Sequence, residues 1–558
     1  MIRFPKGIRR KINEEKMMLK LNLDGLANRE AWESKGIILP KYDIMKMRED
    51  TLANPVWLHF GAGNIFRGFI AVLQQKLLNE GLAECGIIAA DTFDFDMIDK
   101  IYKPYDNLVL NVGLKADGNT NLEVVASLAE AVKGDFADVT ERQRLMEIIS
   151  APSLQMVSFT ITEKGYALRD MEGKLLNFVK QDIEAGPNQP KHAMSVVTAL
   201  LWKRYNSGAQ PIALCSMDNC SHNGEKLRDS VIEIAKGWRK KGYVTEEFLS
   251  YIEDETRVSF PWSMIDKITP RPAKEIEEML ENMGVADMNP VVTNRNTYIA
   301  AFVNAEIPQY LVMEDRFPNG RPALEKAGVY LTDRDTVNKT EKMKVTTCLN
   351  PLHTAMAVYG CLLGYDHIAK EMKDADIYGL VEQIGYKEGL PVVTDPGIIH
   401  PKDFIDEVMK ERLPNLYIPD MPQRIATDTS MKIPIRFGET IKSYLAAPDK
   451  DAGKLTFIPL AIAGWFRYLL AVDDAGDKME LSADPMLREL TGKLSGIVYH
   501  DPTSYHGELK EILANETIFA TDLVKAGLAD KIENMFCEML AGPGAVRATL
   551  HKYVSKVK

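Results

Sequence analysis

An apolar run, a glycine turn and a helix start between residues 56 and 70 have the residue types that bind a dinucleotide. Gly61 and Gly63 allow a tight turn and a close approach of backbone to a pyrophosphate, which would sit at the amino terminus of the helix. Phe66 occupies the third glycine position of the usual GxGxxG spacing, so a plain strand-to-helix turn remains the alternative. The predicted coenzyme contacts are Phe60, Gly61, Ala62, Gly63, Asn64 and Ile65.

An acidic residue follows the next apolar run. Asp91 comes 28 residues after Gly63, at the end of the strand-like stretch 86–90. A carboxylate at this place accepts hydrogen bonds from the adenosine ribose and repels a 2′-phosphate, which favours NAD over NADP. Asp94 and Asp96 follow closely, so a solvated acidic loop is the other interpretation.

The elements around these residues predict two domains of different class. Strand-like runs at 56–60, 85–90, 107–112 and 155–162 alternate with helix signals such as 69–78, the pattern of a mostly parallel sheet. From about Thr340, helix-period segments dominate, including 353–363, 402–411 and 460–471. We predict an α/β Rossmann-type amino-terminal domain plus a mostly α-helical carboxy-terminal domain. The predicted division is an amino-terminal extension (1–50), a coenzyme domain (51–290) and a helical substrate domain (291–558), with the join between Pro270 and Arg334.

Bulk composition excludes several classes of protein. The 558 residues are 46% hydrophobic and 26% charged, with no apolar stretch of membrane-helix length and no signal-peptide pattern, so a cytoplasmic protein without a membrane partner is expected. Six cysteines without a CxxC pair argue against a zinc ribbon or a disulfide scaffold. The net charge of −11 without a basic tract argues against nucleic acid, and it requires local cations if the substrate is an anion.

Seven segments in order resemble one family, the long-chain mannitol dehydrogenases, over about residues 55–545. They are 59–64 (HFGAGN), 158–166 (SFTITEKGY), 216–219 (SMDN) with 223–224 (NG), 264–270 (MIDKITP), 314–322 (EDRFPNGRP), 350–353 (NPLH) and 424–432 (RIATDTSMK). The resemblance implies NAD as coenzyme and metal-free chemistry. A lysine acts as acid or base on the substrate oxygen while asparagine amides hold that oxygen, which suits the charge that develops there during hydride transfer.

Carried over position by position, the resemblance implies two groups of site residues. The catalytic group is Lys344, Asn219, Asn350 and His353. The substrate-binding group is Asp266, Arg424, Lys432 and, by its spacing from them, Arg436. Each also has an ordinary structural interpretation: a surface ion pair for Asp266, a core histidine for His353, and a solvated basic face for the cations.

The lysine departs from the family spacing by one residue. The family places it five residues before the asparagine, where this chain has Val345, and Lys344 lies six before Asn350. On a regular helix Lys344 would be rotated by about 100° from the expected direction. Pro351 cannot donate a backbone hydrogen bond, so it favours a break or a π-bulge that absorbs one residue. We hypothesise that Lys344 is the acid/base in this shifted register.

The substrate class follows from the cations and the overall resemblance. Arg424, Lys432 and Arg436 lie at spacings of eight and four, near one face if the segment is helical, and Lys267 adds to them. Such a cluster suits a carboxylate, so we expect D-fructuronate and D-mannonate to be interconverted. Tagaturonate reduction and mannitol 2-dehydrogenation are the alternatives. A catalytically inactive nucleotide-binding protein and a metal-dependent polyol dehydrogenase are alternatives of other kinds.

Overall fold

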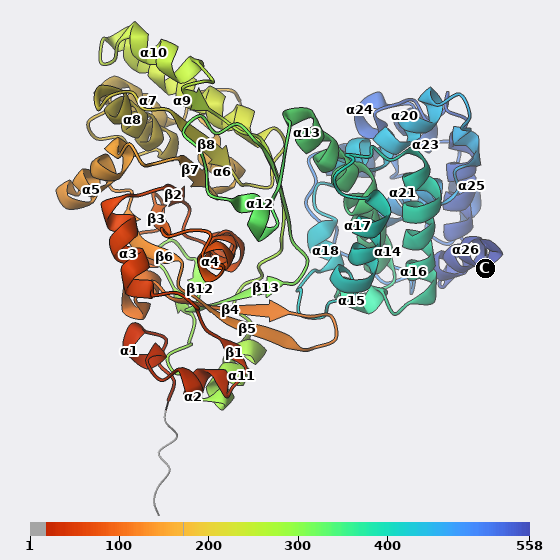
Figure 1. Ribbon diagram of the computed structural model, residues 1–558. Coiled ribbons are helices and arrows are strands. Elements are labelled where there is room, and N and C mark those ends of the chain that lie inside the picture. The colour runs from red at the N-terminus through yellow and green to blue at the C-terminus, as the bar shows by residue number, and fades with distance from the viewer. Residues whose placement is uncertain (1–17, 171, 558) are drawn as a thin grey trace, which may run out of the picture.

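The amino-terminal half is built on a parallel sheet of six strands, and a helical half follows it (Figure 1). The computed structural model describes residues 18–170 and 172–557. The strand order is β6–β3–β2–β7–β8–β9. The bounds are β2 (Trp57–Phe60), β3 (Ile87–Asp91), β6 (Leu128–Lys133), β7 (Met156–Phe159), β8 (Ile212–Ser216) and β9 (Val258–Ser259). The order reverses at β2, which pairs with β3 on one side and β7 on the other. The carboxyl edge at such a reversal is where α/β sheets bind ligands.

Both faces of this sheet are covered, so its central strands β2, β3, β7 and β8 are buried along their whole length. Leu58 and Phe60 share a core with α5, α8, α9 and α10, while Trp57 packs on the opposite face with η1 and α4. The predicted strands at 56–60, 85–90 and 155–162 are confirmed as β2, β3 and β7. The helices and single turns of this half are α4 (Ala71–Asn79), α5 (Val139–Ser150), α6 (Thr162–Tyr166), α7 (Asn177–Ala185), α8 (Ala193–Asn206), α9 (Asn223–Lys241), α10 (Glu246–Glu253), α11 (Lys274–Met283), α12 (Leu324–Ala327), η1 (Phe66–Ile70), η2 (Ile98–Tyr102) and η3 (Lys103–Tyr105).

Two smaller sheets extend the amino-terminal half along the chain. The first has the order β1–β5–β4–β13, so the predicted strand 107–112 belongs to it as β4 and lies outside the parallel sheet. The second has the order β10–β14–β15. Their bounds are β1 (Ile37–Ile38), β4 (Val109–Leu114), β5 (Thr120–Val125), β10 (Ser263–Asp266), β13 (Phe302–Glu306), β14 (Tyr310–Glu314) and β15 (Tyr330–Thr332), with a separate hairpin of β11 (Val291–Val292) and β12 (Tyr298–Ile299).

The pairing of β13 and β14 assigns residues beyond the predicted boundary to the amino-terminal half. β13 pairs with β4 and β14 with β10, so residues 302–332 complete sheets of the amino-terminal half. The predicted division at residues 290 and 291 falls before these strands, because strand signals in this stretch are short and interrupted by turns. We place the boundary just before Arg334, where the first helix of the helical half begins.

The segment before β2 is part of the folded core from residue 18 onward. It contains α1 (Leu23–Leu26), α2 (Arg29–Glu33) and α3 (Ile44–Ala53), and β1 pairs with β5. Trp32 and Ile37 are buried in a core shared with β4, β5 and α11. The predicted amino-terminal extension is therefore folded over residues 18–50, in elements too short to give a periodic signal, and residues 1–17 lie outside the described part of the chain.

The helical half is centred on α14 and α21, and every residue of α21 is buried. The predicted helices at 353–363, 402–411 and 460–471 correspond to α14, to α17 with η7, and to α21. The elements are α13 (Arg334–Met343), η4 (Lys344–Cys348), α14 (Asn350–Leu362), α15 (Ile368–Glu371), α16 (Ala375–Glu382), η5 (Gln383–Gly389), α17 (Pro401–Glu407), η7 (Val408–Arg412), α18 (Pro422–Ile425), α19 (Thr429–Ile433), η8 (Pro434–Gly438), α20 (Glu439–Ala446), α21 (Phe457–Tyr468), α22 (Leu487–Lys493), α23 (Leu509–Leu513), α24 (Glu516–Phe519), α25 (Ala529–Met539) and α26 (Ala545–Val554). No helix within the described ranges has the length and apolar character to span a bilayer.

A buried carboxylate caps the central helix α21. Glu388 accepts hydrogen bonds from the backbone N–H groups of Thr456, Phe457 and Ile458, at 2.5 to 2.8 Å. Burial raises the pKa of Glu388, while these three N–H groups act in the opposite direction. The cap supplies the partners that the first turn of a helix lacks, and the negative charge suits the positive end of the helix dipole.

Removal of this cap is expected to destabilise the helical half. In Glu388→Ala the three buried N–H groups lose their acceptor, which lowers the free energy of unfolding by about 2–4 kcal/mol. Thermal unfolding followed by circular dichroism measures the loss. Glu489→Ala, on the exposed side of α22, is the matched control and should leave the midpoint nearly unchanged. Equal midpoints for the two variants would contradict the role of the cap.

Candidate active site

The turn after β2 forms an open backbone cradle. Gly61 has φ = 101°, and a Cβ there would lie 2.2 Å from the carbonyl oxygen of Thr160, so only glycine fits. A Cβ on Gly63 would meet no atom within 4 Å. The helix begins at Asn64, directly after this open position. Free space beside a helix start fits the pyrophosphate of a dinucleotide.

Asp91 lies against the same turn. Its Oδ2 accepts the N–H of Ala62 at 3.2 Å, and its Oδ1 accepts the N–H groups of Phe93 and Asp94, each at 2.8 Å. Burial raises the pKa of Asp91, and the three N–H groups counteract part of that effect. Oδ2 has a single donor and therefore keeps a lone pair for a ribose hydroxyl. The predicted glycine turn and acid are thus adjacent in space.

The loop after β8 presents Asn219 at the same carboxyl edge of the sheet. The neighbouring Asp218 accepts the N–H groups of Ile161 and Thr162, each at 2.9 Å, which joins this loop to the one after β7. The Asn223 amide donates to the Asp218 carbonyl at 3.0 Å. Asn219 itself is exposed in the complete chain, and the contacts of Asp218 and Asn223 hold the loop that carries it.

Lys344 reaches Asn219 from the helical half. Its Nζ donates to Asn219 Oδ1 at 2.9 Å and to the carbonyl oxygen of Ile265 at 3.1 Å, and it lies 3.7 Å from Asp266 Oδ1. The lysine side chain is only 2% exposed. The nearest charged group is therefore a carboxylate, and the amine is buried between the two halves of the chain.

A π-helical turn accounts for the direction of Lys344. In η4 the N–H of Leu349 bonds to the Lys344 carbonyl at 3.1 Å, five residues back, and α14 then starts at Asn350 with Pro351 in its first turn. The Thr440 hydroxyl donates to the Thr346 carbonyl at 3.1 Å, so one carbonyl of the wide turn has a partner. The predicted bulge before Pro351 is observed, because proline cannot continue the α-helical bonding.

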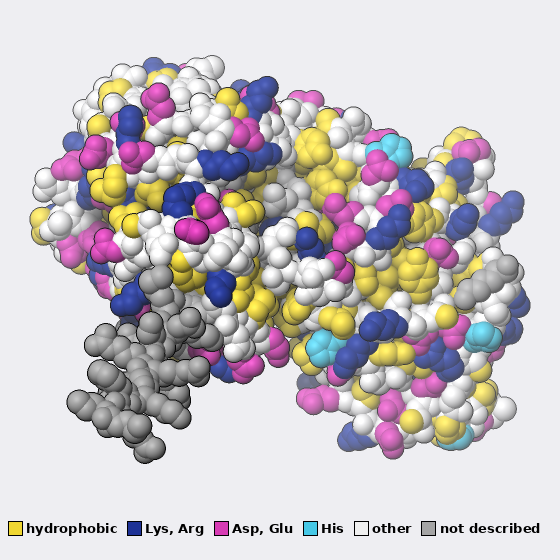
Figure 2. Space-filling view, turned by 60° about the horizontal axis from the view of Figure 1, so that its bottom comes forward, with side chains coloured by type: hydrophobic (Ala, Val, Ile, Leu, Met, Phe, Trp, Pro, Cys, Tyr) yellow, Lys and Arg dark blue, Asp and Glu magenta, His cyan; other side chains and the backbone are white. Residues whose placement is uncertain are grey.

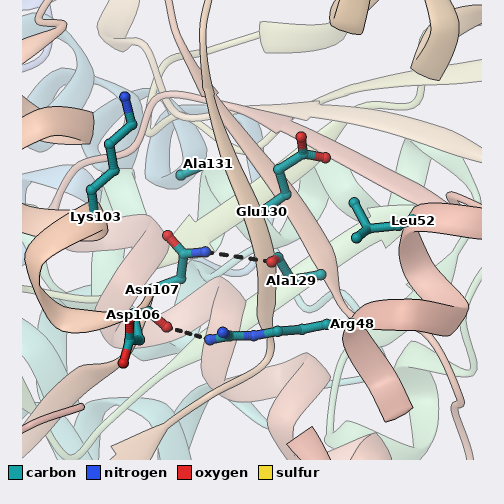
Figure 3. A pocket seen from close by; sticks show the side chains of 8 residues that line it. All are labelled: Arg48, Leu52, Lys103, Asp106, Asn107, Ala129, Glu130 and Ala131. Carbon is teal, nitrogen blue, oxygen red and sulfur yellow. Dashed lines mark hydrogen bonds between the residues drawn. The ribbon is translucent and has the colours of Figure 1, made fainter. Parts of the chain in front are cut away.

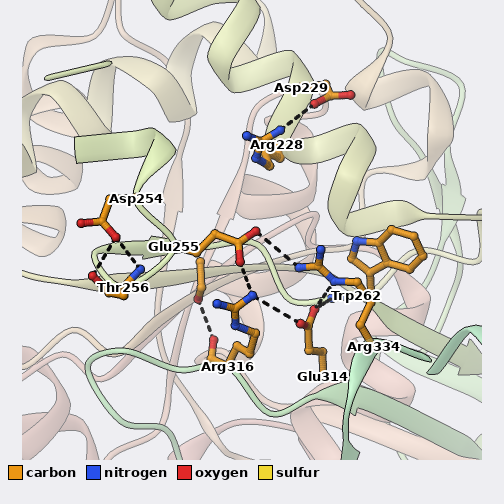
Figure 4. A network of polar contacts seen from close by, with 10 residues as sticks. Arg228, Asp229, Asp254, Glu255, Thr256, Trp262, Glu314, Arg316 and Arg334 are labelled. Carbon is orange, nitrogen blue, oxygen red and sulfur yellow. Dashed lines mark hydrogen bonds and ion pairs between the residues drawn. The ribbon is translucent and has the colours of Figure 1, made fainter. Parts of the chain in front are cut away.

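A surface network ties the start of α13 to the amino-terminal half (Figure 4). Arg334 Nε donates to Glu314 Oε2 at 3.0 Å, and its guanidinium lies 5.3 Å from the centre of the Trp262 ring. The backbone N–H of Trp262 donates to the same Glu314 carboxylate at 3.1 Å. Since α13 continues directly into η4, these contacts fix the helix that carries Lys344.

Three buried charged side chains lie behind the lysine. Asp266 Oδ2 is 2.6 Å from Arg412 NH1, and Arg412 Nε is 2.9 Å from Glu306 Oε2. Burial acts against the charged form of Asp266, yet Lys344 and Arg412 together hold the pKa of this carboxyl below its usual value. Burial raises the pKa of Glu306 to about 7. Asp266 was predicted to contact the substrate. In the structure its carboxylate lies beside two cations, Lys344 and Arg412.

Asn350 and His353 lie one turn apart at the start of α14, as their spacing predicts. The Asn350 amide is half-buried and makes no hydrogen bond with any other described residue, so the two asparagine amides are not joined directly. His353 Nε2 is 3.9 Å from Asp420 Oδ2. Burial lowers the pKa of His353 to about 4, with Arg436, Arg412 and Arg424 acting in the same direction. The imidazole is therefore neutral at neutral pH.

The three predicted substrate cations come from two helical segments. Arg424 lies in α18, and the chain turns at Asp428 with φ = 55° before α19, which carries Lys432 and continues directly into η8, which carries Arg436. Arg424 is therefore not on the same helix as Lys432 and Arg436, which differs from the single helical face expected from the spacing. Lys432 Nζ instead turns back and donates to the carbonyls of Ile425, at 3.0 Å, and Thr427.

Two of these cations, Arg424 and Arg436, lie within electrostatic range of His353. Arg436 donates to the hydroxyl of Thr354, the next residue in α14, at 2.6 Å. Burial lowers the pKa of Arg436 to about 10 and that of Lys432 to about 8. Within residues 18–170 and 172–557, neither side chain has a carboxylate within ion-pair distance. Arg424 pairs with Asp420 and is 66% exposed.

Sequence reasoning did not single out Arg412 or Glu306. One signal was present: Arg412 continues the spacing of Phe404 and Val408, the buried face of α17 and η7. A cation on an apolar stripe indicates a buried ion pair, but the sequence does not name its partners. Glu306 ends a strand buried on both faces and gives no comparable signal.

One cavity lies away from these residues. It has a volume of about 350 Å³ and lies at the edge strand β6, against α3 and η3 (Figure 3). Glu130 in its wall is paired with Arg144 at 2.8 Å, and the Asn107 amide donates to the Ala129 carbonyl. Its polar groups are largely satisfied within the chain, and it shares no residue with the predicted site.

Figure 2 shows basic and acidic side chains interspersed over one face of the molecule. In the described ranges no group of three or more His, Cys, Asp or Glu is arranged for a metal ion.

Comparisons with known proteins show the family of both halves of the chain. Residues 56–326 match the mannitol dehydrogenase Rossmann domain, and residues 336–540 match the mannitol dehydrogenase C-terminal domain. A D-mannonate oxidoreductase of Thermotoga maritima is 51% identical over 540 residues, covering 96% of this chain and 99% of the relative.

Solved structures of two polyol dehydrogenases have the same fold as this chain. Substrate-free D-sorbitol dehydrogenase superposes with a TM-score of 0.77 at 24% identity, over 92% of this chain and 97% of the other. Pseudomonas fluorescens mannitol 2-dehydrogenase, in a ternary complex with NAD and D-mannitol, superposes with a TM-score of 0.68 at 25% identity, over 96% of this chain and all of the other. The chain is a member of the mannitol dehydrogenase family in both of its halves.

Proposed function

We propose that this protein is an NAD-dependent oxidoreductase that interconverts D-fructuronate and D-mannonate, with Lys344 as the acid/base. The observation that carries the proposal is the buried Lys344 amine bonded to Asn219 at the carboxyl edge of the sheet, between the glycine turn and α14. The 51% identity to a D-mannonate oxidoreductase over nearly the whole chain supports the substrate.

The contacts of Lys344 indicate how it would hold the reacting oxygen. Because the ammonium donates to Asn219 Oδ1, the Asn219 NH₂ group is free to donate to a substrate oxygen. The free amide of Asn350 supplies a second donor. The bound nicotinamide supplies or accepts the hydride. Lys344 would give its proton to the oxygen in the direction of reduction and take it back in oxidation, while the amides stabilise the developing charge.

Unpaired cations favour a sugar acid over a neutral polyol. Lys432 and Arg436 are partly buried and bonded only to neutral oxygens. A cation held without an anion in a semi-buried site gains from a carboxylate ligand. The family's name-giving polyol reaction, mannitol 2-dehydrogenation, and tagaturonate reduction remain the alternatives, and an inactive nucleotide-binding protein would have no use for the buried Lys344 contact.

NADH oxidation should discriminate among these substrates. With fructuronate, tagaturonate and fructose assayed side by side, we expect the highest kcat/KM for fructuronate. The cations favour the two sugar acids over fructose, and the 51% identity to a D-mannonate oxidoreductase favours fructuronate over tagaturonate. Turnover of fructose alone would contradict a sugar-acid substrate. Binding of NADH without turnover of any of the three would contradict an oxidoreductase of this class.

Lys344→Ala is the matching test of the acid/base. We expect kcat to fall by at least about 100-fold, because proton transfer from a positioned side chain contributes about that much. The dissociation constant for NADH, measured by fluorescence, should be unchanged, since Lys344 lies outside the coenzyme cradle. Near-normal turnover of Lys344→Ala would remove this residue from the mechanism.

The π-turn gives a further prediction. Pro351→Ala restores an N–H that can bond to the Thr347 carbonyl, so a continuous α-helix becomes possible and Lys344 would rotate by about 100°. We expect kcat to fall at least tenfold with unchanged NADH affinity. Pro502→Ala, at an exposed position, is the control. A Pro351→Ala enzyme with normal kcat would show that the turn does not depend on the proline.

The coenzyme cradle predicts opposite defects at its two glycines. Gly61→Ala should lower the thermal midpoint, because its Cβ meets the Thr160 carbonyl at a positive φ. Gly63→Ala should keep the midpoint but weaken NADH binding about tenfold or more, because its Cβ enters open space that we assign to the pyrophosphate. Gly492→Ala, with no atom near its Cβ, is the control for both. Unchanged NADH binding by Gly63→Ala would contradict that assignment.

A further inference from the structure

A buried cation of the helical half is fixed by two carboxylates of the amino-terminal half. Arg412 ends η7 and is 2% exposed, and its partners Asp266 and Glu306 are 7% and 0% exposed. The carboxylates come from β10 and β13, in two different sheets. Arg412 therefore crosses the junction between the halves at the same place as Lys344.

The two oxygens of Asp266 are divided between the two cations. Oδ2 lies 2.6 Å from Arg412 NH1, whereas Oδ1 lies 3.7 Å from Lys344 Nζ. The shorter contact goes to Arg412, so the Lys344 amine keeps its closer bonds to Asn219 and Ile265. Without Arg412 the Asp266 carboxylate would be free to turn and take Lys344 as its only cation.

Glu306 fixes the arginine from the other side. Its Oε1 accepts the N–H of Ile268 at 2.6 Å, and its backbone carbonyl accepts a bond from Lys267, whose Nζ also donates to Gln309 at 3.0 Å. The Glu407 carboxylate, on the adjoining helix, also lies within electrostatic range of Arg412. The charged groups around Lys344 and Asp266 are thus Arg412, Glu306, Lys267 and Glu407.

We propose that Arg412 is a positioning residue of the reaction: it holds Asp266 away from Lys344 and balances its charge, so that the amine stays on Asn219 and can exchange its proton. The inference rests on the proposed role of Lys344 and goes beyond it. An arginine is required because its Nε and NH1 meet two carboxylates at once, a geometry that the single ammonium of lysine cannot reproduce.

The test uses a variant that removes the cation without leaving an unpaired carboxylate at Glu306. Arg412→Met alone leaves two buried carboxylates and is expected to fold poorly. The double variant Arg412→Met/Glu306→Gln removes one charge of each sign and leaves Asp266 beside Lys344. Lys402→Met, which removes an exposed cation from the same helical segment, is the matched control.

We expect the double variant to bind NADH normally but to lose about 100-fold in kcat, as a displaced catalytic group does. Lys402→Met should change neither kcat nor NADH binding. Arg412→Lys keeps the charge but cannot meet both carboxylates through Nε and NH1, so it should recover only part of the rate.

A crystal structure of the double variant gives a readout that does not depend on turnover. We expect Lys344 Nζ to leave Asn219 Oδ1 and move within hydrogen-bond distance of Asp266. A folded double variant with the Lys344–Asn219 contact unchanged would overturn the proposal, whatever the substrate. Failure of the wild-type protein to turn over any of the three sugars would instead contradict the proposed function. The two failures are distinguishable, because the crystal structure of the variant does not depend on the substrate.

Discussion

The structure depends on burying the Lys344 ammonium at the junction of two halves. An ion removed from water needs hydrogen bonds and counter-charge to offset its lost solvation. The three partners of this amine, Asn219, the Ile265 carbonyl and Asp266, all belong to the amino-terminal half, whereas the lysine belongs to the helical half. The site is therefore complete only when the halves are packed together, which links the stability of the junction to the reactivity of the amine.

Local features of the site could be predicted from the sequence because their causes are local. The turn at Gly61 follows from a strand, two glycines and a helix start, and the structure shows that a Cβ would strike the next strand's carbonyl. The acid at Asp91 follows from the end of an apolar strand. The π-turn at Lys344 follows from Pro351, whose missing N–H acts on residues within one helical turn. In each case the sequence signal lies within a short stretch of chain, although the contact that makes glycine necessary at position 61 comes from the distant Thr160.

Features that depend on distant partners could not be predicted. Arg412 meets Asp266 and Glu306 across 146 and 106 residues, and no spacing rule connects such positions. Residues 302–332 become strands because β4 and β10 are available to pair with them, which a sequence window does not contain. The cations at 424, 432 and 436 were expected near one helix face, but the left-handed Asp428 separates Arg424 from the helix that carries Lys432 and Arg436, and Arg436 bonds to Thr354 of α14.

The charge distribution reconciles an acidic protein with the proposed anionic substrate. The net charge of −11 repels anions. At physiological salt this repulsion is largely screened beyond a distance of about 8–10 Å. Attraction must therefore come from inside the site. His353 cannot supply it, because its pKa of about 4 leaves the imidazole neutral at neutral pH. Arg412 cannot supply it either, because Asp266 and Glu306 already neutralise it. Among the predicted substrate cations, which all lie in the described part of the chain, Lys432 and Arg436 have no carboxylate at ion-pair distance, whereas Arg424 is paired with Asp420. A carboxylate bound by Lys432 and Arg436 would orient the sugar so that its reacting oxygen meets Lys344.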